Sequence, residues 1–74
     1  MRESFIEALK CKYEAEIAAG KATARVYLEK PVAIGEHPQL LDELDKVLTK
    51  ISNAEENLKT LSKYFDTNND DDIP

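Results

Sequence analysis

The 74-residue chain is long enough for one small domain, and its single cysteine excludes an internal disulfide. The net charge is -5, but residues 1–65 hold all ten basic side chains and eleven of the fifteen acidic ones, so this part is nearly neutral. Without a concentrated basic surface, direct binding to nucleic acid is not expected. No apolar run could span a membrane, and the first residues lack a signal-peptide pattern, so we expect a cytoplasmic protein without membrane contact.

The first predicted helix covers residues 3–29. Glu3 and Glu7 suit the positive end of its dipole. The helix is expected to end before Pro31, because proline disfavours helical geometry at the residue that precedes it. One face carries the positions expected to pack on a second helix: Ile6, Leu9, Tyr13, Ile17, Gly20, Ala24 and Leu28.

The opposite face of this helix is uncharged and built from small residues. It contains Ala8, Cys11, Ala15, Ala18, Ala22 and Val26. Such a face could let another helix approach closely, or it could reflect no more than the high helix propensity of alanine. At Cys11 a small buried hydrophobic group is favoured over a reactive thiol.

A second helix is predicted over residues 38–65, after a loop at 30–37. Pro38 suits its first turn, where the missing N–H group costs nothing. Leu41 and Leu48 widen the apolar stripe in its first half, so that half needs more than one neighbouring helix. Apolar residues follow each other at spacings of four and three: Leu40, Leu44, Val47, Ile51, Ala54, Leu58, Leu61 and Phe65.

These elements predict an all-α fold, an antiparallel two-helix hairpin. The core of so small a hairpin is marginal, and association is the usual remedy. We therefore expect two copies to form a four-helix bundle as a homodimer. The predicted interface consists of Leu41, Leu48, Ala8, Cys11, Ala15, Ala18 and Ala22.

Residues 66–74 form an acidic tail for which two interpretations stay open. Four acids and one large apolar residue cannot offset the entropy of ordering, which predicts a disordered, solubilising tail. The last five residues also resemble the acidic tip of bacterial single-stranded DNA-binding proteins, although the final phenylalanine of that tip is missing. That resemblance implies a partner-binding tail formed by Asp70, Asp71, Asp72 and Ile73.

The sequence offers no set of residues for catalysis, a metal or a cofactor. His37 is the single histidine, and with Glu36 beside it the pair falls short of a metal site. No phosphate-binding loop, zinc spacing or Ser-His-Asp arrangement is present. We therefore expect no enzyme, no bound metal and no cofactor.

Residues 35–38, Gly-Glu-His-Pro, precede an acidic, leucine-rich helix. In this the chain resembles small uncharacterised helical proteins of large tailed, myovirus-type phages, which have no assigned activity. The resemblance implies an accessory factor in the cytoplasm of an infected bacterium.

Three function classes can be ranked from the sequence. The leading one is a small homo-oligomeric protein that acts by contact with an unidentified protein partner. The alternative is an accessory factor of nucleic-acid metabolism that recruits partners through its acidic tail or mimics a negatively charged surface. An enzyme comes last, because no convergent catalytic groups can be named.

Overall fold

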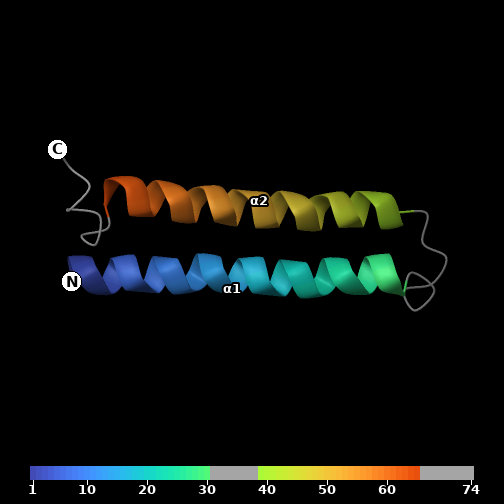
Figure 1. The fold of residues 1–74 in the computed structure, drawn as a ribbon, viewed down its shortest axis with the longest axis horizontal. Coiled ribbons are helices and arrows are strands. Elements are labelled where there is room, and N and C mark those ends of the chain that lie inside the picture. Colours follow the sequence, from blue (N-terminus) through green and yellow to red (C-terminus); the bar gives the residue numbers. More distant parts are fainter. Residues whose placement is uncertain (31–38, 66–74) are drawn as a thin grey trace.

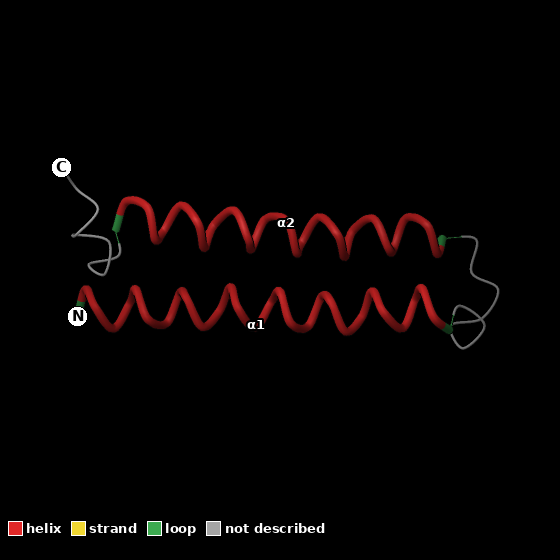
Figure 2. Tube along the Cα trace, viewed as in Figure 1, coloured by secondary structure: helices red, strands yellow, loops and turns green. Residues whose placement is uncertain are grey.

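Two long helices lie side by side and run in opposite directions (Figure 1). The computed structural model describes residues 1–30 and 39–65. Helix α1 spans Arg2–Glu29 and helix α2 spans Leu40–Tyr64. Figure 2 shows helices and short turns but no strand in these two ranges, which confirms the all-α class.

Several sequence-based predictions fall outside the described ranges. These are most of the predicted loop, the helix start at Pro38 and the acidic tail with Asp70, Asp71, Asp72 and Ile73. The four-helix bundle also stays a prediction, because the structure holds one chain.

The open end of the hairpin is held by a contact between the two helices. The Arg2 guanidinium donates a hydrogen bond from Nη2 to the carbonyl oxygen of Phe65, with 2.6 Å between the two atoms. The start of α1 therefore lies level with the end of α2.

The charges at the two ends of α2 suit its dipole, with Asp42 and Glu43 in the first turn and Lys63 in the last.

Helix α2 packs through the stripe with spacings of four and three. Seven of its eight positions are buried or half-buried, and Phe65 at the end is 55% exposed. A narrow stripe of this length is what a helix needs in order to lie along one neighbour at a shallow angle. The predicted packing face of α2 is thus confirmed for Leu40, Leu44, Val47, Ile51, Ala54, Leu58 and Leu61.

Helix α1 follows the same spacing, which corrects two predicted core positions. Leu9 is 37% exposed, and Lys10 is half-buried in its place. Leu28 is 67% exposed, and Tyr27 is half-buried in its place. Two helices in continuous contact keep a 3.5-residue repeat, whereas a face read at 3.6 residues per turn drifts by about 20° every seven residues. Over the length of α1 that drift moves Leu28 off the line along which the two helices pack, which we call the seam. The observed packing face is Ile6, Lys10, Tyr13, Ile17, Gly20, Ala24 and Tyr27.

The two helices approach closely where Gly20 faces Ile51. A Cβ atom added to Gly20 would lie 2.5 Å from Cγ1 of Ile51, which is too close for real atoms, and 3.1 Å from Cδ1, which is a tight contact. The bare backbone of α1 therefore makes room for the Ile51 side chain. This contact also shows that Gly20 and Ile51 lie at the same level of the hairpin.

Replacing Gly20 with alanine should lower the free energy of unfolding despite the better helix propensity of alanine. The gain in propensity is about 1 kcal/mol, whereas overpacking a close contact costs about 1–3 kcal/mol. We expect a net loss of about 1 kcal/mol in urea unfolding followed by circular dichroism. Ile51→Ala removes both contacting carbons, so it should cost less stability in the Gly20→Ala background than in wild type. An alanine variant at Gly20 that is more stable than wild type would contradict this account of the contact.

The core of the single hairpin is small. Among the described residues Ala24, Ala54 and Leu61 are buried, and Leu61 is the one large side chain of the three. Within residues 1–30 and 39–65 the exposed large apolar side chains are Met1, Phe5, Leu9, Val26, Leu28, Leu41, Leu48, Tyr64 and Phe65.

Candidate functional site

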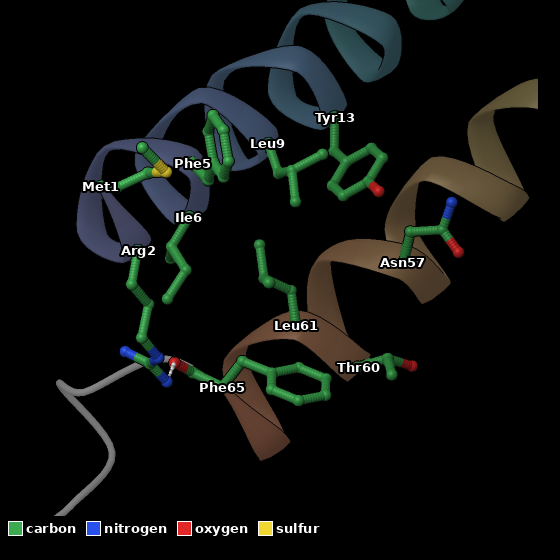
Figure 3. Close-up of a pocket in the computed structure, with 10 residues that line it drawn as sticks. All are labelled: Met1, Arg2, Phe5, Ile6, Leu9, Tyr13, Asn57, Thr60, Leu61 and Phe65. Atoms are coloured by element: carbon green, nitrogen blue, oxygen red, sulfur yellow. Dashed lines mark hydrogen bonds between the residues drawn. The ribbon is translucent and has the colours of Figure 1, made fainter.

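An open apolar groove of about 690 Å³ lies where α1 begins and α2 ends (Figure 3). We call it the terminal groove. Arg2 is its one charged lining side chain, and it closes the end of the groove through its bond to Phe65. The groove is lined by Met1, Arg2, Phe5, Ile6, Leu9, Tyr13, Asn57, Thr60, Leu61 and Phe65.

The groove exists because its two walls differ in side-chain size. The wall formed by α1 carries Phe5 and Leu9, which lie one turn apart. The wall formed by α2 carries the short polar side chains of Asn57 and Thr60. Leu61 points from α2 toward α1 and is 8% exposed, so it forms the floor (Figure 3). The groove can therefore take an apolar side chain, and it offers no pair of groups for proton transfer.

A second, smaller groove continues along the same side of the hairpin. It has a volume of about 560 Å³ and shares Tyr13 and Asn57 with the terminal groove. In it the Lys12 ammonium donates to Oε2 of Glu16 over 2.8 Å, and this hydrogen bond with the carboxylate charge raises the pKa of Lys12. Because its lining includes the charged side chains of Lys12, Glu16 and Lys50, this groove is a weaker candidate for binding an apolar group.

The opposite side of the hairpin carries a separate set of exposed leucines, which line neither of these two grooves. In the seven-residue repeat, the positions directly beside the packing face form a strip along each helix. This side of the hairpin consists of one such strip on α1 and one on α2. Leu28, Leu41 and Leu48 are 67%, 78% and 53% exposed, and we call them the leucine patch. The two strips hold Glu7, Glu14, Lys21 and Leu28 on α1, and Leu41, Leu48, Glu55 and Ser62 on α2.

All seven residues of the predicted dimer interface are exposed in the single chain: Leu41, Leu48, Ala8, Cys11, Ala15, Ala18 and Ala22. The interface itself stays a prediction. In the seven-residue repeat Ala8, Ala15 and Ala22 lie opposite the seam, whereas Cys11 and Ala18 border the leucine side. A flat partner surface that covers the leucines would therefore reach Cys11 and Ala18 more readily than the three alanines opposite the seam.

The sequence did not predict the terminal groove, and it placed Leu28 in the packing face of the first helix rather than on the surface. Phe5 and Met1 belong to no regular stripe, so periodicity gave no signal for them. For Leu28 a signal did exist, because it follows Glu7, Glu14 and Lys21 at intervals of seven residues. Following that interval would have placed Leu28 beside the seam rather than in it.

Cys11, expected as a small buried group, is exposed in the single chain. Its thiol lies 3.7 Å from Oε2 of Glu7, to which it donates a hydrogen bond. Neighbouring atoms remove part of the water around the thiol, and this, followed by the charge and hydrogen bond of Glu7 and the charge of Glu14, raises the pKa of Cys11. A raised pKa lowers the fraction of thiolate, which is the reactive form.

Cys11 should therefore react more slowly with iodoacetamide than a cysteine in the unfolded chain at the same pH. Replacing Glu7 with glutamine removes a carboxylate that disfavours the thiolate, so the pKa should fall and alkylation should become faster. The measurement is the alkylation rate from pH 7 to 10 for wild type, Glu7→Gln and a matched Glu3→Gln variant. Equal rates for all three would show that Glu7 does not act on the thiol.

Within residues 1–30 and 39–65, neither helix is long and apolar enough to cross a membrane. No three His, Cys, Asp or Glu residues in these ranges are grouped so that they could hold a metal ion. His37 and Glu36 lie outside the described residues.

No protein-family model matches the chain, and no similar curated protein or solved structure was found. The resemblance to proteins of myovirus-type phages stays a prediction. The functional argument therefore depends on the surfaces of the hairpin.

Proposed function

We propose that this protein is a small, non-enzymatic accessory factor that acts by protein–protein contact, as a homodimer whose two hairpins form a four-helix bundle. One observation carries the proposal: large apolar side chains are exposed on both sides of a hairpin whose own core is very small. On a monomer, large apolar patches of this kind normally mark contact surfaces.

The leucine patch is proposed as the surface for self-association. Fully burying a leucine contributes about 1.5–3 kcal/mol, and these three residues are 53% to 78% exposed. Six leucines across a dimer would then contribute roughly 6–12 kcal/mol. Association costs about 4–15 kcal/mol in lost freedom of motion. The two amounts are comparable, so we expect a dimer that depends on concentration in the micromolar range.

The terminal groove is proposed as the surface for a different protein. It lies on the other side of the hairpin, so a dimer built on the leucine patch leaves it open. Its apolar walls and the cationic Arg2 at its end suit an apolar side chain followed by an acidic group. The phage resemblance supports placing this contact in the cytoplasm of an infected bacterium.

Sedimentation equilibrium between about 5 and 200 µM tests the proposed self-association, since it spans the micromolar range expected for a marginal interface. A mass that rises from one chain toward two supports the homodimer. A mass of one chain throughout would overturn it, because the leucine patch would then stay in water.

A further inference from the structure

The leucine side of the hairpin is divided along its length into an apolar half and an acidic half. Two contacts set the levels, since Arg2 is tied to Phe65 and Gly20 faces Ile51. With these levels fixed, Leu28 lies beside Leu41 near the end where the two helices are connected, which we call the loop end. The acidic half, toward the open end, holds Glu7, Glu14 and Glu55.

A second copy could lie on this side in either of two directions. If its loop end lay over the open end of the first copy, the leucines of each hairpin would cover Glu7, Glu14 and Glu55 of the other. Covering a carboxylate with an apolar group removes its water and gives nothing in return. If both loop ends lay together, leucine would meet leucine and the acids would stay at the far end.

Charge favours copies that lie in opposite directions, whereas the burial of apolar side chains favours copies with both loop ends together. Lys21 and Arg25 lie toward the loop end, so copies in opposite directions could pair them with Glu14 of the other copy. Exposed ion pairs of this kind contribute little and are weakened by salt. Removing six leucines from water contributes more, so apolar burial decides the direction.

We infer that the second copy packs its leucine patch on the leucine patch of the first, with both loop ends at the same end of the dimer. This inference rests on the proposed homodimer and specifies its geometry. The contact is isologous, because the same surface is used by both copies. Leu28, Leu41 and Leu48 are 67%, 78% and 53% exposed, so each copy offers the other the same apolar side chains to cover.

A distance between spin labels distinguishes the two directions. A label at Glu29→Cys, in a Cys11→Ser background, marks the last residue of α1. With loop ends together, the two labels are separated only by the width of the bundle, about 20–30 Å. In opposite directions the rise along α1 alone separates them by at least about 40 Å. The longer distance in a confirmed dimer would overturn the inference and leave the homodimer standing, whereas a single-chain mass would overturn both.

Two substitutions then test which side carries the contact. Leu28→Lys puts a charge in the leucine patch while suiting the negative end of α1, and Phe5→Glu puts one in the terminal groove while suiting the positive end. We expect the dimer to be weakened at least about tenfold by the first and to be unchanged by the second. The reverse result, with both variants still helical by circular dichroism, would move the contact to the groove side.

Ionic strength gives an independent readout of the same geometry. With loop ends together the acidic halves of the two copies repel each other, so added salt should strengthen the dimer or leave it unchanged. A dimer that weakens as salt rises would instead require ion pairs between opposite halves, and would overturn the inferred direction.

Discussion

Replacing Leu61 with alanine is expected to lower the free energy of unfolding by about 3 kcal/mol. Leu61 is 8% exposed and forms the floor of the terminal groove between α1 and α2. Its loss removes the one large side chain that is buried among the described residues. For a chain of this size the change corresponds to a fall in melting temperature of more than about 10 °C. Thermal unfolding followed by circular dichroism at 222 nm measures it.

Tyr64→Ala is the matched control for Leu61→Ala. Tyr64 is 64% exposed and lies in the same turn of α2, so its removal should cost less than about 1 kcal/mol. Equal losses for the two variants would mean that the core of the hairpin is not centred on Leu61. Both are best measured below the concentration at which dimers form, since association would add its own stability.

The packing face of α2 could be predicted because its apolar pattern is unambiguous. No polar residue interrupts the four-three spacing from Leu40 to Phe65, so one face satisfies the sequence. The exposure of Phe65, at the end of this apolar stripe, was harder to predict. Phe65 fits the same spacing but lies where α1 begins, and it is 55% exposed. Periodicity specifies a direction around the helix, and burial also requires a neighbour at that level.

The packing face of α1 was harder to predict because two patterns overlap in it. Leu9 and Leu28 fit a face of 3.6 residues per turn, whereas Lys10 and Tyr27 fit the 3.5-residue repeat that the structure adopts. Lys10 is half-buried, and the long stem of a lysine can cover an apolar surface although the residue counts as polar in a sequence pattern. The repeat depends on contact with α2, so α1 alone does not specify it.

The two candidate surfaces differed in how visible they were in the sequence. Leu41 and Leu48 stood out because they widen a stripe that was already regular. The terminal groove depends on the difference in size between Phe5 or Leu9 and the facing Asn57 or Thr60. That difference becomes apparent once the level of α1 against α2 is known, and this level is a tertiary property.

The largest effect on assembly is expected from Leu48→Glu. Leu48 is 53% exposed in the single hairpin and lies in the leucine patch, so a glutamate there would have to lose water in the dimer. We expect the dissociation constant of the dimer to rise by roughly 100-fold or more, which corresponds to about 2.7 kcal/mol. The hairpin itself should stay helical, since the substituted side chain lies outside the seam.

Glu55→Ala is the matched control, because Glu55 lies seven residues later on the same strip of α2. It removes a charge from the acidic half, where the two copies repel each other, so the dimer should be unchanged or slightly tighter. Sedimentation equilibrium of wild type and both variants at equal ionic strength measures the difference. If Leu48→Glu dimerised as well as wild type, the leucine patch would not be the contact between copies. A strong loss in Glu55→Ala instead would place that contact in the acidic half.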